Sequence, residues 1–355
     1  MREPFDLTTL IEPLLNWFKD HARVLPWRNE PTPYRVWVSE IMLQQTRVEA
    51  VKPYFDRFLK ELPDVAALSD CPEEKLLKLW EGLGYYNRVR NMQIAAQTVM
   101  ENYHGELPAD YEALTKLKGI GHYTAGAIAS IAVDGNVLRV ISRVTEDDAD
   151  IMKASVRTAM EKDLLEIMPE NRAGAFNQAL MELGATVCLP NGAPLCEACP
   201  WKEVCRAQKS GRWRELPVKS KAKARRIEDR TVLVIKAEDK VLLHKRANKG
   251  LLAGLYEFPN VEGHLKEEEV ITYLKKMGLS PIRLKKLEDS RHIFSHIEWH
   301  MTGYAVQIDE TEQEYQNMLF VDVKETEEQY PIPAAFSRYT GYMNIRLGND
   351  RYKEE

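Results

Sequence analysis

Four cysteines that lie close together in the chain constrain its folding more than any other feature. Cys188, Cys196, Cys199 and Cys205 fall within 18 residues, separated by seven, two and five residues. Four thiolates this close form a closed tetrahedral set, suited to a zinc ion or an iron–sulfur cube. Zinc sites usually show two short cysteine pairs, and only one occurs here, so the spacing favours a 4Fe–4S cluster. Buried free thiols are the simpler alternative.

Length and composition predict two domains of ordinary globular type. The 355 residues are enough for two hydrophobic cores, and the net charge of −5 by itself indicates neither a nucleic-acid nor a membrane partner. Basic residues crowd the stretch from Lys202 to Arg226, which can hold a polyanion locally or form a solvated linker. Met1–Glu12 lacks the pattern of a secretory signal, and no apolar run approaches the roughly 20 residues of a membrane helix. We therefore expect a soluble, intracellular protein whose cysteines are ligands rather than disulfides.

The character of the chain changes near residue 217. Before that point apolar residues recur at helical spacing over Leu14–Lys19, Val36–Val51, Glu73–Leu79, Arg88–Met100, Thr124–Ile131, Val156–Ile167 and Ala175–Leu183. Beyond it, a helix is predicted over Glu267–Met277 and strands over Thr231–Lys236, Lys240–Lys245 and Ile293–Met301. The pattern predicts a mostly α region over residues 1–210, a basic linker over 211–230 and an α+β domain over 231–355.

A glycine turn, a helix and an aspartate follow one another between residues 117 and 137. Gly119 and Gly121 allow the backbone to turn tightly, and a helix is predicted from Thr124. Unpaired N–H groups at the start of such a helix suit a phosphate. Asp134 follows ten residues after Thr124. A phosphate-binding turn with an acid close behind indicates chemistry on a nucleic acid, although a plain structural turn is the alternative.

Taken together, the motifs resemble one superfamily. They are Leu25–Arg28, Val36–Thr46, Gly82–Tyr86, the hairpin at 117–131, Val133–Val137 and the cysteines. This set resembles the helix-hairpin-helix DNA glycosylases of the endonuclease III superfamily, and is similar to MutY-type adenine DNA glycosylases, which remove adenine mispaired with 8-oxoguanine. The resemblance covers nearly the whole chain. It implies base-excision repair by a monomer that carries a 4Fe–4S cluster in loop 188–205, binds duplex DNA containing 8-oxoguanine:adenine mispairs, and acts at the nucleoid in bacterial cytoplasm.

Adenine is a poor leaving group unless one of its ring nitrogens is protonated. The reaction therefore needs a general acid on the base side and a negative charge beside the cationic sugar. Glu40 lies on an apolar predicted helix, whose surroundings would raise its pKa; a surface glutamate is the alternative. The resemblance assigns Glu40 as the acid, Asp134 as the partner of the sugar cation, and Tyr123 and Asn136 as supports. Bifunctional relatives have a Schiff-base lysine at the position of Tyr123, so we predict base removal without efficient lyase activity.

Further residues are predicted to contact the base and the duplex. By resemblance, Arg23, Trp27 and Gln178 surround the flipped adenine, with helix packing as the alternative for Gln178. Gln44 and Tyr85 suit wedging into the duplex from the minor groove, with a core aromatic as the alternative for Tyr85.

The second domain resembles the Nudix-like domain with which this family contacts 8-oxoguanine. Residues 254–259 match its opening, whereas Glu267–Glu269 do not form the Arg-Glu-x-x-Glu-Glu metal set. Nucleotide hydrolysis is therefore not expected. By resemblance, Phe294, Ser295 and His296 match the tripeptide with which the family contacts 8-oxoguanine. The Ser295 hydroxyl can hydrogen-bond a base edge, and the two rings flank it; an ordinary strand residue is the alternative for His296.

The chain departs from the family pattern just before Asp134. Ala132 joins Val133 directly, several residues sooner than the resemblance leads us to expect. Small displacements of catalytic groups cost about a hundredfold in rate. A lesion-sensing DNA-binding protein with impaired catalysis is therefore the alternative function. A thymine-glycol or mismatch glycosylase of the same superfamily is a further one, against which Tyr123 and the second domain speak.

Overall fold

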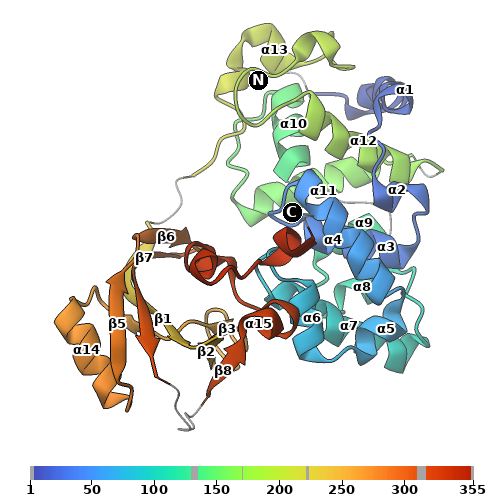
Figure 1. Cartoon of the computed structure of the whole chain (residues 1–355). Coiled ribbons are helices and arrows are strands. Elements are labelled where there is room, and N and C mark those ends of the chain that lie inside the picture. The colour runs from blue at the N-terminus through green and yellow to red at the C-terminus, as the bar shows by residue number, and fades with distance from the viewer. Residues whose placement is uncertain (1–3, 129–134, 170, 221–223, 310–316, 353–355) are drawn as a thin grey trace. The chain divides into compact units, whose positions relative to one another are not determined.

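The computed structural model describes residues 4–128, 135–169, 171–220, 224–309 and 317–352, without the side chains of His122, Tyr123 and Ala127. The chain forms two compact units (Figure 1). The helical unit comprises Met1–Leu59, Pro63–Ser69 and Asn91–Lys221, and the sheet unit comprises Lys60–Leu62, Asp70–Arg90 and Ala222–Glu355. In the described part, the helices are too short or too polar to cross a membrane.

The helical unit is built around helices that bury apolar faces against one another. Its helices are α1 (Ile11–His21), α2 (Pro26–Asn29), α3 (Pro33–Leu43), α4 (Val48–Glu61), α5 (Val65–Asp70), α7 (Asn87–Tyr103), α8 (Tyr111–Thr115), α9 (His122–Ile128), α10 (Gly135–Thr145), α11 (Ala154–Glu166), α12 (Ala173–Thr186) and α13 (Arg206–Ser210). One core joins α1, α10 and α12 through Leu14, Val140 and Leu180. The mostly α prediction for this part of the chain is confirmed.

The single helix predicted over Val36–Val51 is wrong. The chain leaves the helix at Leu43 and re-enters one at Val48. Between them Gln45 adopts a left-handed φ of 59°, and the Thr46 N–H donates to the Leu43 carbonyl at 3.2 Å. The apolar periodicity continues across this break because both helices bury one face. The pattern therefore gives no sign of the left-handed residue between them.

Of the helical hairpin predicted over 117–131, the turn and the second helix, α9, lie in that range, whereas the first helix, α8, ends before it at Thr115. The Ile120 N–H donates to the Leu117 carbonyl at 3.1 Å, and Gly119 takes a φ of 77° that favours glycine. The Asp110 side chain caps α8 by accepting from the Ala113 N–H at 2.7 Å. The predicted helix end at Ile131 lies outside the described residues.

The sheet unit holds one mixed sheet between two layers of helix. Its strands are β1 (Arg226–Ala237), β2 (Lys240–Lys245), β3 (Tyr256–Glu257), β4 (Asn260–Glu262), β5 (Pro281–Lys286), β6 (Ser290–Ile293), β7 (Ile297–Ile308) and β8 (Met318–Asp322). They are ordered β3-β2-β1-β7-β5, with β4 on β1, β6 on β7 and β8 on β2. β1 and β7 run parallel throughout, from Arg226 opposite Ile297 to Ala237 opposite Ile308.

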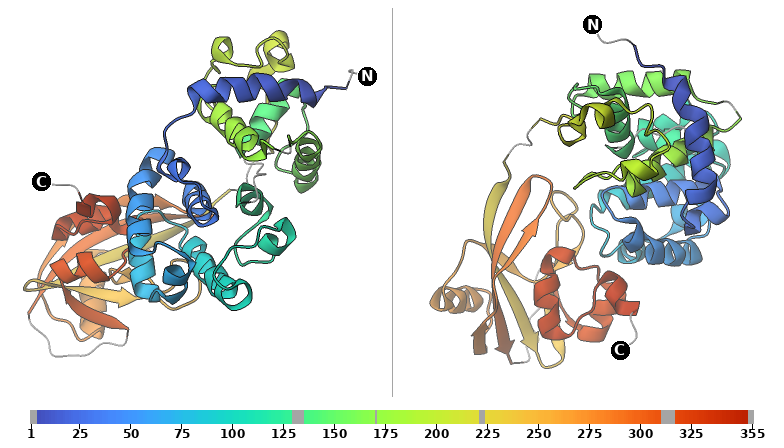
Figure 2. Two further views of the ribbon diagram at one scale, coloured as in Figure 1. Left: turned by 90° about the vertical axis from the view of Figure 1, so that its right-hand side faces the viewer. Right: turned by 90° about the horizontal axis from the view of Figure 1, so that it is seen from above.

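Alternating side chains of β1 bury both faces of the sheet. Leu233 and Ile235 pack under α14 (Glu267–Lys276), while Val232 and Val234 share a core with Phe336. That second core also holds residues around α16 (Ser337–Thr340), so helices cover both faces (Figure 2). α6 (Glu73–Leu79) and α15 (Val323–Gln329) complete the unit. The expected α+β fold of the C-terminal domain is confirmed.

The stretch predicted as a linker, 211–230, is ordered at both ends. The Leu216 carbonyl accepts from Arg143 Nε at 2.9 Å, and the Val218 carbonyl accepts from the Ile151 N–H at 3.1 Å. At the other end, β1 already begins at Arg226. In the described part of the predicted linker, Leu216 is buried and the basic residues are exposed or half-buried.

The strand predicted over Ile293–Met301 is also wrong. β6 stops at Ile293, the Phe294 N–H donates to the Ile297 carbonyl at 2.8 Å, and β7 then returns antiparallel. Ser295 and His296 are the two exposed residues at the tip of this hairpin. Neither is the Gly or Asn that usually marks so tight a turn, and alternation alone therefore suggested continuity.

Candidate functional site

A pocket of about 590 Å³ in the helical unit gathers the residues predicted to process the base. Its lining includes Arg23, Trp27, Glu40, Gln44, Asn136 and Gln178. These side chains come from α2, α3, α10, α12 and the loops beside them, and the chain order alone does not bring them together. A volume of this size is typical of pockets that enclose a small organic group. Arg28, Arg157 and Glu182 also line the pocket; Arg28 belongs to the Leu25–Arg28 motif, whereas Arg157 and Glu182 lie outside the motifs that predicted the site.

Glu40 is nearly buried in the pocket wall, with 6% of its surface exposed. It lies on α3, whose first turn is capped by Thr32 and whose inner face buries Trp37 and Ile41. At the end of α3, Gln44 Nε2 lies 3.5 Å from Thr124 Oγ1 of α9, where it donates a long hydrogen bond. A carboxyl group that solvent barely reaches, at the wall of a base-sized pocket, is suited to proton delivery.

Glu182 carries a buried negative charge beside Glu40's pocket. Its side chain is 1% exposed and accepts from Arg23 Nε at 2.6 Å and from Arg28 Nη2 at 2.9 Å. Burial acts to raise the pKa of Glu182, but the hydrogen bonds and charges of the two arginines outweigh it, so the pKa lies below its ordinary value. Glu182 follows Gln178 by one helical turn, and that spacing was the signal that could have identified it.

The start of α10 is held tightly against α12. Arg139 Nη2 donates to Asn136 Oδ1 at 3.0 Å and to the Gly184 carbonyl at 2.8 Å. A Cβ at Gly184 would lie 2.7 Å from the Cβ of Asn136, so only glycine permits this approach. Asp134 directly precedes α10 and, like the Ala132–Val133 junction, lies outside the described residues. Its predicted role and that of the Tyr123 side chain therefore stay predictions.

The residues predicted to contact the duplex divide between the two units. Gln44, Gly119 and Gly121 belong to the helical unit, whereas Tyr85 and the hairpin tip at 294–296 belong to the sheet unit. Tyr85 is 47% exposed, which excludes the alternative of a core aromatic. At the tip, the Phe294 ring lies between those of His292 and Trp299, with ring centroids 4.7 and 5.0 Å away, and Ser295 and His296 are exposed.

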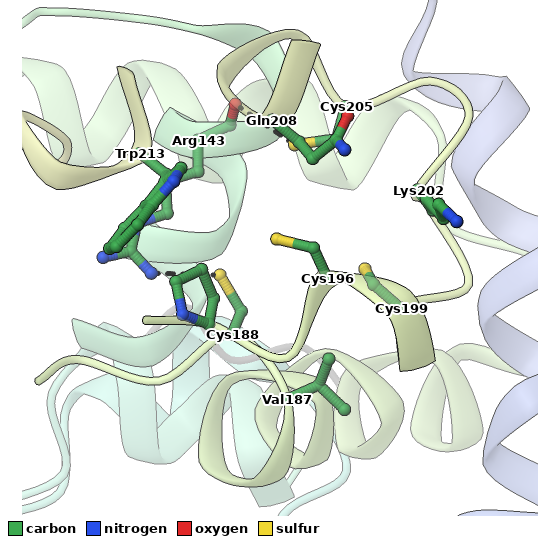
Figure 3. A pocket seen from close by; sticks show the side chains of 10 residues that line it. Arg143, Val187, Cys188, Cys196, Cys199, Lys202, Cys205, Gln208 and Trp213 are labelled. Carbon is green, nitrogen blue, oxygen red and sulfur yellow. Dashed lines mark hydrogen bonds between the residues drawn. The ribbon is translucent and has the colours of Figure 1, made fainter. Parts of the chain in front are cut away.

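The four cysteines line one pocket together with Arg143, Lys202 and Trp213 (Figure 3). Arg143 Nη1 donates to Cys188 Sγ at 3.4 Å, and Cys205 Sγ lies 3.7 Å from the Arg143 carbonyl. Among the described residues no three His, Cys, Asp or Glu side chains converge on a single ion position. Four thiols on one loop are donors of the kind that hold a zinc ion or an iron–sulfur cube.

Burial raises the pKa values of three of these thiols. It raises the pKa of Cys199 to about 12 and also raises the pKa values of Cys196 and Cys205. A metal ligand must be a thiolate, so a positively charged centre would have to displace these protons.

Comparisons with known proteins agree with this arrangement. Residues 38–166 match the HhH-GPD superfamily of base excision DNA repair proteins, and residues 230–340 match the NUDIX domain. The adenine DNA glycosylase of Buchnera aphidicola subsp. Baizongia pistaciae is 33% identical over 304 residues, which cover 82% of this chain and 84% of that protein. The adenine DNA glycosylase of Mus musculus is 36% identical over 370 residues, covering 86% of this chain and 72% of that protein.

A solved structure supports the fold of the helical region. A thermostable thymine-DNA glycosylase is similar to this chain with a TM-score of 0.50 and 26% identity, covering 57% of this chain and 96% of that one. Two relatives above 30% identity, each matched over more than two thirds of its length, establish the family. The chain belongs to the adenine DNA glycosylases, a family of helix-hairpin-helix base excision DNA repair enzymes with a C-terminal Nudix-like domain.

Proposed function

We propose that the protein is a monofunctional glycosylase that hydrolyses the N-glycosidic bond of adenine opposite 8-oxoguanine in duplex DNA. The observation that carries this proposal is the pocket in which Glu40 meets Arg23, Trp27 and Gln178. The curated relatives named above are adenine DNA glycosylases, which supports adenine as the base removed. We further propose that it acts as a monomer on nucleoid DNA in bacterial cytoplasm.

The pocket supplies what bond cleavage requires. Glu40 protonates a ring nitrogen of the flipped adenine, so that the base leaves as a neutral molecule. Arg23, held by Glu182, and the buried Trp27 shape the space around the base. Asp134, placed by sequence next to α10, provides negative charge to the cationic sugar. Glu40 then assists attack by water on the sugar.

The hairpin tip at 294–296 supports 8-oxoguanine as the opposite base. Ser295 and His296 are exposed polar residues at the end of a short, well-packed hairpin. Hydrogen bonds from such groups to a base edge distinguish bases that differ by one oxygen. The buried neighbour Trp299 holds Phe294 in place behind them.

We also propose that Cys188, Cys196, Cys199 and Cys205 hold a 4Fe–4S cluster. When bound, the cluster would supply structural cross-linking of loop 188–205 rather than acid–base chemistry. The loop carries Lys202 and leads into Arg206, so ordering it presents positive charge to phosphates. Broad visible absorption with about four irons per chain supports this assignment, and stoichiometric zinc contradicts it.

The decisive experiment is single-turnover release of adenine from a duplex with one 8-oxoguanine:adenine pair. The native protein should release adenine, and Glu40→Gln should lose about 100- to 10,000-fold in rate, because a general acid contributes a factor of that size. Asp134→Asn should also lose activity. Glu30→Gln is the matched control, since its carboxylate is exposed and lies outside the pocket. Tight binding by the native protein without release would support the lesion-sensing alternative and overturn this proposal.

Tyr123 makes a separate prediction. Without a lysine amine at this position, borohydride should trap no covalent complex with an abasic product. Tyr123→Lys is the informative companion, because a new amine at that position should raise the trapped fraction. Efficient trapping by the native protein would contradict the monofunctional assignment.

A further inference from the structure

A buried ion pair in a short segment of the HhH-GPD region makes hydrogen bonds to the C-terminal segment of the sheet unit. Lys78 and Glu81 are 8% and 0% exposed, and Lys78 Nζ lies 2.9 Å from Glu81 Oε1. Lys78 Nζ also donates to the carbonyls of Thr326 at 3.3 Å and Tyr330 at 3.0 Å. These carbonyls belong to α15 and to the residue that follows it.

Glu81 completes the connection from its other side. Its carboxylate accepts from the Ile332 N–H at 2.9 Å and from the Gly348 N–H at 3.0 Å. Ile332 belongs to the same core as Trp299, and Phe294 packs against that core. Glu81 therefore hydrogen-bonds to the backbone of a residue in the core against which Phe294 packs.

The turn that follows Glu81 presents Tyr85 to solvent. Gly82, Gly84 and Tyr85 have φ values of 97°, 68° and 48°, so three residues take left-handed backbone within four positions. Trp80 Nε1 donates to the Gly84 carbonyl at 3.1 Å, and Arg88 Nη2 donates to the same carbonyl at 3.1 Å. A non-glycine residue at positive φ persists only when its surroundings determine it.

Arg88 stabilises this turn through hydrogen bonds to its carbonyl groups. It donates to the Leu83 carbonyl at 2.9 Å, and its guanidinium lies 5.3 Å from the Trp80 ring centroid and 5.7 Å from that of Tyr85. Trp80 is fully buried, whereas Tyr85 is not. The exposed Tyr85 ring therefore follows directly on a buried segment that includes Trp80 and Glu81.

We propose that Glu81, paired with Lys78, is a positioning residue that fixes the Tyr85 turn to the sheet unit, so that Tyr85 and the 294–296 hairpin contact DNA as parts of one unit. This inference rests on the proposed function, because it links insertion of Tyr85 to recognition of the opposite base. Loss of the link weakens discrimination between 8-oxoguanine and guanine more than it weakens adenine removal itself. Removing one member of a buried ion pair also leaves the other uncompensated.

Further polar contacts join residues 70–90 to the rest of the sheet unit. Glu74 Oε1 lies 2.6 Å from Lys245 Nζ and accepts from Tyr256 Oη at 3.1 Å. Arg90 Nη2 donates to the Ala253 carbonyl at 2.7 Å. These partners are more exposed than Glu81, which makes Glu81 the position where one substitution has the largest effect.

The test uses the full chain with the substitution Glu81→Gln. A double variant, Lys78→Met/Glu81→Gln, is also made, because it leaves no lone buried charge and so keeps the test possible if the single variant fails to fold. Val270→Ala is the control: it removes buried volume from α14 on the opposite face of the sheet and does not touch the turn. Amide hydrogen exchange of residues 82–86 is measured without DNA. Single-turnover adenine release is then measured opposite 8-oxoguanine and opposite guanine.

In the Glu81 variants, exchange at residues 82–86 should accelerate, and the ratio of the two release rates should fall by about fivefold to tenfold. In Val270→Ala neither readout should change. Equal changes in the control, or an unchanged rate ratio despite faster exchange, would overturn the inference. A native protein with no preference for 8-oxoguanine would instead refute the proposed function, while the exchange data would still decide whether Glu81 positions the turn.

Discussion

At the scale of single residues, Glu182 shows how one carboxylate organises a pocket rich in arginine. It receives Arg23 and Arg28, and Arg28 Nη1 also donates to the Arg23 carbonyl at 2.9 Å. Two arginines beside one ionised glutamate leave a net positive pocket wall. Burial and positive charge act in opposite directions on a carboxyl group in such a wall: burial favours the protonated form, and positive charge favours the ionised form.

Substitution of Glu182 should change how stability depends on pH. The pKa of Glu182 is lowered in the folded protein, so the folded state binds its proton less tightly than the unfolded state does. Its contribution is therefore present above the ordinary pKa of about 4.5 and is lost as pH falls through the lower folded pKa. Glu182→Gln should lower the unfolding free energy at pH 7 by about 3 kcal/mol and flatten its decline below pH 4.5.

Chemical denaturation at several pH values measures both effects. Glu30→Gln is the control, since the Glu30 carboxylate is 77% exposed and its pair with Arg35 contributes little. An acid decline in Glu182→Gln as steep as that of the native protein would contradict the prediction.

At the scale of elements, the turn between α8 and α9 places two glycines under different demands. Gly119 has a φ of 77°, and a Cβ there would lie 2.6 Å from the Cβ of Asn91. Gly121 has no positive φ, and nothing lies within 4 Å of its Cβ position. The structure therefore requires glycine at position 119 but not at position 121.

Alanine substitutions should separate the two positions. Gly119→Ala should lower the unfolding free energy by about 1–3 kcal/mol, because left-handed backbone and the contact with Asn91 both penalise a Cβ. Gly121→Ala should change it by less than about 0.5 kcal/mol. Urea unfolding gives both values. Equal losses at the two positions would mean that the turn does not depend on the backbone conformation of Gly119.

At the scale of the whole molecule, the sheet unit is assembled from distant parts of the chain. Residues 60–62 and 70–90 pack with the sheet although they fall in the region that the sequence predicts as helical glycosylase. The buried Lys78–Glu81 pair satisfies backbone groups of the C-terminal segment, including the Ile332 and Gly348 N–H groups. An unpaired buried N–H is costly, so these groups depend on the distant segment.

A fragment of residues 224–355 should therefore be less stable than the same residues in the full chain. Hydrogen exchange at Ile332 and Gly348 should be faster in the fragment, and its thermal midpoint should be lower. A peptide of residues 70–90 should restore part of the protection, and the same peptide with Glu81→Gln should restore less. Identical protection in the fragment and the full chain would contradict this prediction.

Periodic patterns in the sequence predicted most elements close to their observed positions. The predicted helix Glu73–Leu79 coincides with α6, and Ala175–Leu183 lies within α12. Prediction failed where the chain turns without glycine or proline, at Gln44–Arg47 and at Ser295–His296. At both breaks the flanking elements bury side chains on one face. The apolar periodicity is therefore the same with or without the left-handed residue in the first break and the two-residue turn in the second.

The sequence predicted some of the residues that line the pocket and missed others. Arg23, Trp27, Glu40 and Gln178 were assigned to the site by resemblance and line one pocket, whereas Glu182 was missed because a lone glutamate on a helix usually faces solvent. Its importance depends on Arg23, which is far from it in sequence.

The sequence by itself determined the family and the helical and sheet character of the two regions, and it selected the side chains that we propose to carry a proton, hold a metal centre or contact a base. These properties follow from residue type and local spacing. Only the tertiary structure decided that Glu182 joins the pocket and that the Tyr85 segment belongs with the sheet. Both depend on contacts between residues remote in the chain: the Arg23–Glu182 ion pair, and the hydrogen bonds that join Lys78 and Glu81 to backbone groups between Thr326 and Gly348. Local spacing carries no information about such pairings, because they form only when folding brings the two segments together.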